Sequence, residues 1–344
     1  MTLTLALMLL RANFLAPLAL VARTTRTLCA LSSGQRGLVV VDGHNLAYRM
    51  YYGMPPMATK AGQPAGALLG FVNKVVSLHT DYPEHNLLVA FDAGPTFRND
   101  LLSTYKGSRK KMPPDLRTQL AAIYEACDVL GVPYVAAPNF EADDVVASAC
   151  AAARAAGNYE EVVVVSSDKD LLQLVDDGAA GATSVSVYCD KKKVWFDEAA
   201  VREKHGVTPG QLVDYLALVG DASDDVPGVP GVGPKGAAKL LAEHGDLDSI
   251  LAAAESTMKK SKRRESLREN AEEARLARQL ITLRDDVPLD AGAALGARLP
   301  PAENQPDLRP FLQRWEMAQL ERRLFSAPAR AAARAAPADN VVPF

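Results

Sequence analysis

The chain has 344 residues, of which 48% are hydrophobic and 23% charged, and this composition is typical of a globular protein large enough for two domains. Its formal net charge of −3 excludes a global electrostatic attraction to nucleic acid, so such binding must come from local basic segments. The cysteines are widely spaced and form no CxxC pair, which argues against a disulfide framework or a zinc site and predicts reduced thiols at Cys29, Cys127, Cys150 and Cys189.

Residues 1–36 differ in composition from the rest of the chain. They hold four arginines, several serines and threonines and no acidic residue, which is typical of an organellar transit peptide. The apolar run at 3–10 is short and is followed by Arg11 and Pro17, so a membrane-spanning helix is not expected. A secretory signal region, alone or ahead of a transit peptide, is the alternative. We expect a leader to a plastid or mitochondrion, outside the fold.

Short apolar runs rich in branched residues alternate with longer helical patterns after the leader. Strands that are apolar throughout and separated by helices indicate a parallel sheet covered on both faces. The predicted fold class is therefore α/β, with strands at 38–42, 87–92, 132–136, 162–168 and 184–188.

Three predicted strands end in an aspartate, namely Asp42, Asp92 and Asp168, and Asp170 follows two residues later. Ligands of open α/β sheets bind just beyond the carboxyl ends of the strands, so these side chains should converge on one crevice. A single aspartate at a strand end is unremarkable because aspartate favours turns. Several of them at one edge indicate a site.

The segment at 139–146 (AsnPheGluAlaAspAspValVal) places Glu141, Asp143 and Asp144 at the start of a predicted helix. Acidic residues in a first turn stabilise a helix through its dipole, so an ordinary helix start is one interpretation. The other interpretation is that a cation holds these carboxylates together.

From about residue 204 the pattern changes to helices and turns. The segment at 220–236 is dense in glycine and proline and leads into a helical pattern, which predicts a helix, a tight hairpin and a second helix whose N–H groups can bind phosphate. A plain connection between helices is the alternative. Residues 265–325 are predicted to be helical, and the tail at 327–344 disordered.

The acids expected at this edge are numerous enough to predict a metal centre. Magnesium takes oxygen ligands, and two such ions a few ångströms apart suit in-line attack on a phosphodiester. So many carboxylates stay ionised in one cleft only if divalent cations neutralise them. The candidate ligands are Asp42, Asp92, Glu141, Asp143, Asp144, Asp168, Asp170, Asp221 and Asp224.

The sequence resembles the 5'-3' exonuclease and flap endonuclease family, and in particular the 5' nuclease domain of bacterial DNA polymerase I. The order and spacing of the motifs are highly specific, and the similarity covers about 37–325. No polymerase region follows, so a freestanding nuclease is expected. The matching stretches are ValAspGly at 41–43, PheAspAlaGlyProThrPheArg at 91–98, TyrLysGlySerArg at 105–109, GluAlaAspAsp at 141–144, SerAspLysAspLeuLeuGlnLeuVal at 167–175 and the segment at 220–236.

The resemblance implies a role for each candidate ligand. Asp221 and Asp224 would complete a second metal position, and Asp144 would support the catalytic cluster. The family usually has Asn at Asp225, which is not counted as a ligand. Two or more Mg²⁺ ions are expected, with Mn²⁺ as a substitute and K⁺ at the hairpin. The catalytic cluster would comprise Asp42, Asp92, Glu141, Asp143, Asp168 and Asp170.

The resemblance also implies the residues that contact DNA. Lys106 and Arg109 would lie on a helical arch at about 97–118 and engage the scissile phosphate. Tyr105 and Phe97 are placed to stack on unpaired bases, with core packing an equal alternative for Phe97. The hairpin would grip the duplex backbone without reading sequence, through Gly228, Gly231, Gly233, Lys235 and Lys239.

The expected architecture is a PIN-like (resolvase-like) catalytic domain at 37–203 and a helix-hairpin-helix domain at 204–326. The expected activity is metal-dependent hydrolysis of DNA near a 5' end or at the base of a 5' flap, by a monomer acting in organellar DNA replication or repair with the proteins of that process. Two alternatives stay open. One is a nuclease acting on RNA primers or RNA–DNA hybrids, and the other is a non-catalytic module that binds branched DNA.

Overall fold

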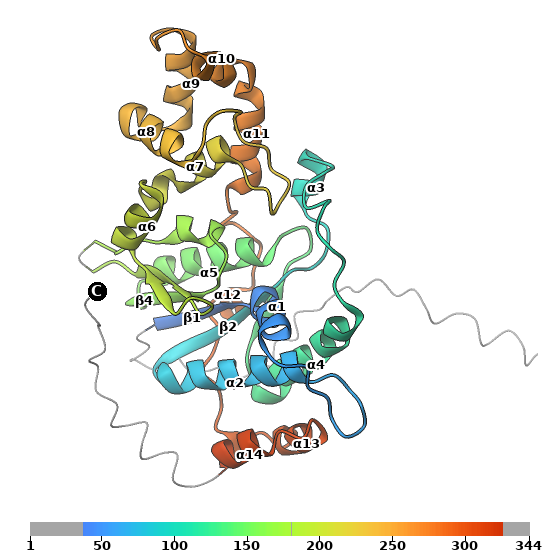
Figure 1. The fold of residues 1–344 in the computed structure, drawn as a ribbon. Helices are drawn as coiled ribbons and strands as arrows, with labels where there is room; N and C mark the ends of the chain where they lie inside the picture. Colours follow the sequence, from blue (N-terminus) through green and yellow to red (C-terminus); the bar gives the residue numbers. More distant parts are fainter. Residues whose placement is uncertain (1–36, 180, 326–344) are drawn as a thin grey trace, which may run out of the picture.

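The computed structural model describes residues 37–179 and 181–325. The predicted leader at 1–36, with Cys29, and the predicted disordered tail at 327–344 lie outside the described residues. The described chain forms an α/β part with a helical part standing on it (Figure 1). Within the described ranges, no helix has the length and apolar character needed to cross a membrane.

A six-stranded sheet in the order β3-β2-β1-β4-β5-β6 forms the centre of the α/β part. The first five strands in sequence pair in parallel, whereas β6 pairs antiparallel with β5 at one edge. The five predicted strands and the α/β class are confirmed. The prediction missed β6 because only Phe196 of its three residues is buried. The strands are β1 (Gly37–Asp42), β2 (His85–Phe91), β3 (Tyr134–Ala136), β4 (Glu161–Val165), β5 (Ser184–Cys189) and β6 (Val194–Phe196).

Helices cover both faces of this sheet, which explains why its strands are apolar without interruption. Alternate residues of β1 face opposite sides: Val39 packs in one core with Phe71, and Val40 packs in the other with Val145. The first core lies under α1 (Gly43–Gly53), α2 (Gly66–Asp81) and α4 (Pro114–Leu130), and the second under α5 (Ala142–Ala156). The thiols of Cys127, Cys150 and Cys189 are buried and free, as predicted.

The helical part contains the predicted helix, hairpin and second helix. The loop between α7 and α8 folds back so tightly that a Cβ on Gly228 would lie 2.3 Å from the carbonyl carbon of Val219. Gly231 has a φ of 79°, which glycine adopts without strain. These glycines set the shape of the hairpin. The helices are α6 (Glu198–His205), α7 (Leu212–Val219), α8 (Pro234–His244), α9 (Leu247–Glu255), α10 (Lys262–Glu269) and α11 (Ala271–Ile281).

The single C-terminal domain predicted at 204–326 needs correction, because the chain returns to the α/β part after α11. The amide of Leu87 donates to the carbonyl of Ala297 (2.9 Å), next to β2. Phe311 and Leu312 pack in the same core as Phe71. Figure 1 shows the last two helices below α2, at the opposite end from α8 to α11. The returning helices are α12 (Ala291–Ala294), α13 (Leu308–Arg314) and α14 (Ala318–Phe325).

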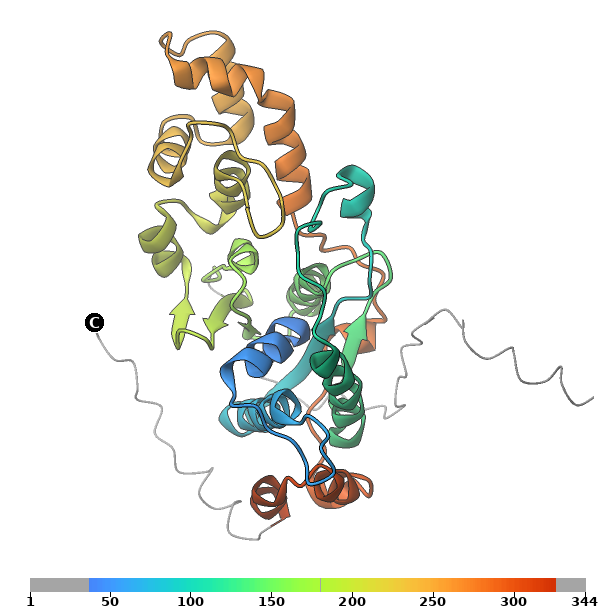
Figure 2. The ribbon, with the colours of Figure 1, turned by 45° about the vertical axis from the view of Figure 1, so that its right-hand side comes forward.

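The predicted helical arch at about 97–118 is helical only at its ends. It begins with α3 (Phe97–Leu101), and α4 starts at Pro114, whereas the residues between them form turns and extended chain. Lys106 has a φ of 54°, which no right-handed helix accommodates, and proline favours the first position of a helix over its interior. Figure 2 shows this irregular segment, here called the arch segment (102–113), passing beside the loop that follows α7.

A buried arginine joins the two parts of the molecule. Arg98 is 1% exposed, and its Nη1 and Nη2 donate to the two carboxylate oxygens of Asp144 at 2.7 and 2.8 Å. Its Nε donates to the carbonyl of Leu280 (2.6 Å) and its Nη2 to that of Thr282 (3.1 Å). One guanidinium thereby connects α3, α5 and the end of α11.

Asp144, which was predicted to support the metal cluster, is instead paired with this arginine. Its carboxylate is fully buried and also accepts hydrogen bonds from the amides of Glu141 (3.0 Å) and Arg284 (2.9 Å). With Arg98, these donors occupy both oxygens. Asp144 begins α5 and holds Arg98, so the interpretation of this segment as a helix start is correct for this residue.

Replacing Arg98 with alanine should lower the free energy of unfolding by about 3–5 kcal/mol, because Asp144 would remain buried without its counter-charge. Arg284→Ala, which removes an exposed ion pair with Asp286, is the control and should lower the free energy of unfolding far less, because exposed ion pairs contribute little to stability. Urea unfolding followed by circular dichroism measures both. Equal midpoints for the two variants would contradict the role assigned to Arg98.

Candidate metal centre

The carboxylates gather where the sheet meets the helical part. Asp42 is the last residue of β1 and caps α1 by accepting from the amide of Asn45 (3.0 Å). Asp92 directly follows β2, and Asp168 follows β4. Because parallel strands share one carboxyl edge, these acids lie on the same side, where α5 also begins. The loop after α7 brings Asp221 to this edge from the helical part.

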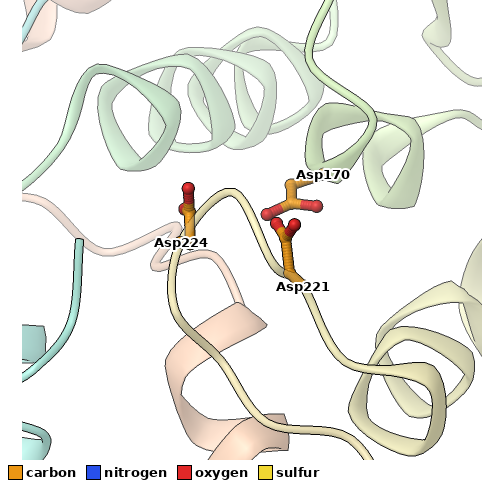
Figure 3. A group of neighbouring side chains, drawn as sticks. All are labelled: Asp170, Asp221 and Asp224. Carbon is orange, nitrogen blue, oxygen red and sulfur yellow. The ribbon is translucent and has the colours of Figure 1, made fainter. Parts of the chain in front are cut away.

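Three of the acids form a compact donor group. Asp170, Asp221 and Asp224 each offer one carboxylate oxygen, and these oxygens all lie within 4.8 Å of one another (Figure 3). The Oδ1 atom of Asp170 is buried and has no hydrogen-bond partner among residues 37–179 and 181–325. A buried acceptor without a donor is costly unless a cation binds it, and oxygen donors are those that Mg²⁺ and Mn²⁺ prefer. The residues present therefore fit a divalent metal.

Further acids extend this group across the sheet edge. Burial raises the pKa of Asp42 to about 7, although its backbone hydrogen bond with Asn45 opposes the shift, and the charges of Asp92 and Asp168 add to it. Burial, followed by the charges of Asp168 and Asp42, raises the pKa of Asp143. The pKa of Asp170 is raised by burial, then by Asp168. Asp168 interacts with all three of these carboxyl groups, so the acids form one cluster that binds protons or cations.

Asp92 lies at the rim of this cluster. Its side chain is 44% exposed, and its Oδ1 accepts from the amide of Ala142 at 2.8 Å. The Nδ1 atom of His44 accepts from the amide of Asp92 (3.0 Å), and burial lowers the pKa of His44. His44 is therefore neutral at pH 7 and forms no ion pair with Asp92.

Lysine and arginine side chains contact the same acids. The Nζ atom of Lys106 lies 2.7 Å from Oε1 of Glu141 and 3.5 Å from Oδ2 of Asp224. Arg109 contacts Asp224 as well. The structure thus places Lys106 and Arg109 of the arch segment against the acidic cluster, where a phosphate can compete for them.

Lys169 is a site residue that the sequence reasoning missed. Its Nζ lies 2.7 Å from Oδ1 of Asp221. The signal was available, because Lys169 lies between Asp168 and Asp170 in a segment already assigned to the metal centre.

Tyr105 does not have the exposure that its predicted role requires. It is 5% exposed, and its hydroxyl lies 3.2 Å from Oε2 of Glu141 and 3.3 Å from Oδ2 of Asp224. Its ring is not exposed for stacking on a base, and its hydroxyl instead bridges the carboxylates of Glu141 and Asp224. Phe97 is half-buried, with its ring 6.1 Å from that of Phe140, which is the packing alternative.

The hairpin residues divide into two kinds. Gly228 lies against backbone and shapes the loop, whereas Gly231 and Gly233 are exposed next to the start of α8. Lys235 and Lys239 are exposed on α8, and Lys239 lies 3.7 Å from Glu243. The exposed glycines and lysines form a surface suited to a phosphate backbone.

The raised pKa values predict how stability depends on pH and metal. Without metal, stability should fall as pH rises from the ordinary value of 3.8 to about 7, the folded value for Asp42, because the folded state holds its protons more tightly. In EDTA the Tm should therefore be lower at pH 7.5 than at pH 5.5. Adding Mg²⁺ should raise the Tm more at pH 7.5 than at pH 5.5.

Asp143→Asn should be more stable than the unmutated protein in EDTA at pH 7.5, because it removes one repelling charge. The Tm of this variant should also rise less on addition of Mg²⁺ than that of the unmutated protein. The exposed Asp115→Asn is the control and should behave as the unmutated protein does. A Tm that does not respond to Mg²⁺ at either pH would contradict the metal centre.

The comparisons with known proteins cover most of the chain. Residues 37–206 match the family model described as 5'-3' exonuclease, N-terminal resolvase-like domain, and residues 207–303 match that described as 5'-3' exonuclease, C-terminal SAM fold. The chain is 41% identical over 300 residues to DNA polymerase I of Rhizobium leguminosarum, covering 84% of this chain and 28% of the relative. It is 37% identical over 295 residues to the thermostable DNA polymerase I of Thermus thermophilus, and this match covers 85% of this chain and 34% of the relative.

Solved structures with the same fold are more distant in sequence. The zinc-bound T5 5'-exonuclease has a TM-score of 0.61 at 23% identity and covers 83% of this chain and 99% of its own. The bacteriophage T5 D15 flap endonuclease, in complex with DNA and metal ions, has a TM-score of 0.60 at 24% identity. The match covers 83% of this chain and 100% of the endonuclease chain. The chain spans about a third or less of the curated relatives it matches. Both family models match in order, and the chain belongs to the 5'-3' exonuclease family.

Proposed function

We propose that this protein is a divalent-metal-dependent 5'-3' exonuclease and 5'-flap endonuclease that hydrolyses DNA. The convergence of Asp170, Asp221 and Asp224 from both parts of the chain carries the proposal, because it forms a compact group of carboxylate oxygens beside the buried Oδ1 atom of Asp170, which has no hydrogen-bond partner in the described part of the chain. Family membership supports it. So does the T5 flap endonuclease of similar fold, which is described with DNA and metal ions.

The acids divide into two candidate metal positions. Asp170, Asp221 and Asp224 would hold one ion, and Asp42, Asp143 and Asp168 a second. Two bound Mg²⁺ ions would supply a hydroxide nucleophile at neutral pH and stabilise the leaving oxygen. Glu141 holds Lys106 through an ion pair of 2.7 Å and thereby keeps that ammonium at the same edge.

The arch segment supplies positive charge for the phosphate that is cut. Lys106 and Arg109 contact carboxylates now, and a phosphate entering the cleft would compete for them. The segment is fixed by backbone bonds, since the amide of Lys106 donates to the carbonyl of Asp224 (3.0 Å) and that of Ser108 to Oδ2 of Asp225 (2.8 Å). Charges held in place before reaction lower the barrier without reorganisation.

The hairpin suits a substrate chosen by shape. Gly231, Gly233 and Lys235 offer contacts to phosphates, which orient a duplex without reading its sequence. A duplex held there, with one strand entering the acidic cluster, is the arrangement that a junction or a 5' end provides. This geometry supports structure-specific cutting.

A role in organellar DNA replication or repair is part of the proposal and rests on the composition of residues 1–36. The polymerase or ligase of such a process would be a partner. A fluorescent reporter fused to residues 1–36 should enter a plastid or mitochondrion. A reporter that stays in the cytosol would remove this part of the proposal.

The direct test is cleavage of a 5'-labelled flap DNA by the full chain. Cutting should require Mg²⁺ or Mn²⁺ and stop in EDTA. Asp170→Asn should lower kcat at least about 100-fold, a loss comparable to removing one element of electrostatic stabilisation. Asp115→Asn removes the same charge from an exposed position on α4 and should keep full activity.

Parallel substrates separate the alternatives. A blunt duplex measures exonuclease activity, and an RNA–DNA hybrid tests action on primers. Faster cutting of the hybrid than of flap DNA would make RNA the substrate. Tight binding of the flap without cutting in any metal would show a DNA-binding protein and overturn the proposed activity.

A further inference from the structure

A small pocket opens beside the metal centre, at the carboxyl ends of β4 and β5. Its volume is about 40 Å³. Ser167 and Asp168 form the wall next to the metal centre, and β6 and α6 contribute Phe196 and Lys204 on the other side. The pocket and the metal centre thus share Asp168, at the edge where open α/β sheets bind ligands.

Three lysines line this pocket, and within the described chain one of them has a carboxylate partner. Lys169 is paired with Asp221 at 2.7 Å. Among the described residues, no carboxylate forms an ion pair with Lys192 or Lys204. The Nζ atom of Lys204 lies 4.5 Å from the centre of the Phe196 ring, which orients it at the pocket.

The charge of Lys192 acts on Lys204. Burial lowers the pKa of Lys204, and the charge of Lys192 lowers it further. Lys192 and Lys204 line the same pocket, and among the described residues neither forms an ion pair with its carboxylate, Asp168. Ammonium groups without an ion pair attract an anion, and lysine binds phosphate as a point charge.

We propose, on the basis of the proposed function, that Lys192 and Lys204 bind a phosphate of the nucleic-acid strand next to the phosphate that is cut. The shared wall explains why the anion belongs to the substrate. Asp168 repels a free anion, whereas a strand that already bridges the metal centre carries its next phosphate past Asp168 into the pocket. The bound group is either the terminal 5' phosphate or an internal phosphodiester.

The test compares two double variants of the full chain that remove equal charge. The pocket variant combines Lys192→Gln with Lys204→Gln and removes the two lysine charges that have no ion-pair partner among the described residues. Lys191→Gln with Lys193→Gln is the control, since Lys191 and Lys193 are exposed and neither lines the pocket. Lys193 pairs with Asp190, which keeps Arg49 and Lys74 as partners.

Affinity for a flap DNA is measured by fluorescence anisotropy in Ca²⁺, which tolerates looser coordination geometry than Mg²⁺ and serves to hold the strand, with gels confirming that the DNA stays intact. The pocket variant should bind about 10-fold more weakly. Its log Kd should depend less on log salt concentration, with a slope smaller by about 1–2 because it contacts fewer phosphates. The control variant should match the unmutated protein.

Flap DNAs with a 5' phosphate and with a 5' hydroxyl distinguish whether the pocket binds the terminal phosphate or an internal phosphodiester. If the pocket holds the terminal phosphate, the unmutated protein prefers the phosphorylated flap and the pocket variant loses this preference. If it holds an internal phosphodiester, the pocket variant weakens both flaps equally. Equal Kd and equal slope for the pocket and control variants would overturn the proposal.

The binding assay also separates this inference from the proposed activity. Unmutated protein that binds flap DNA in Ca²⁺ but fails to cut it in Mg²⁺ would refute the nuclease and still test the pocket. Cutting that persists with a Kd unaffected by the pocket variant would refute the pocket alone.

Discussion

Repulsion among carboxylates packed at one edge of a parallel sheet is the constraint around which this molecule is built. Asp42, Asp143 and Asp170 are all placed so that burial and neighbouring acids favour their protonated forms. Such an arrangement costs stability in the protein alone and persists only because the surrounding fold imposes it. The cluster is therefore best understood as a receptor for cations.

The fold imposes that arrangement through contacts between its two parts. Arg98 holds Asp144 and the end of α11 together, and Tyr105 lies between Glu141 and Asp224. The donor group of Asp170, Asp221 and Asp224 exists only while these parts stay in register. A buried guanidinium with several partners is strongly directional, so it fixes this register better than apolar packing would.

Positive charge is distributed in the same way around the cluster. Lys106 and Lys169 each pair with an acid of the site, whereas Lys192 and Lys204 line a pocket and have no ion-pair partner in the described part of the chain. On the proposed function, a substrate that carries phosphates would meet paired cations over the metal centre and unpaired ones beside it. This division would separate the phosphate that is cut from the phosphates that only position the strand.

The sequence by itself determined the parallel α/β core, the hairpin and the collection of acids, because strand burial, glycine spacing and strand-end aspartates are local patterns. Only the tertiary structure showed that Asp144 serves Arg98, that Tyr105 is buried, and that residues after α11 return to the sheet. Those outcomes depend on contacts between segments far apart in the chain, such as Arg98 with Leu280, and spacing within a single segment carries no information about them.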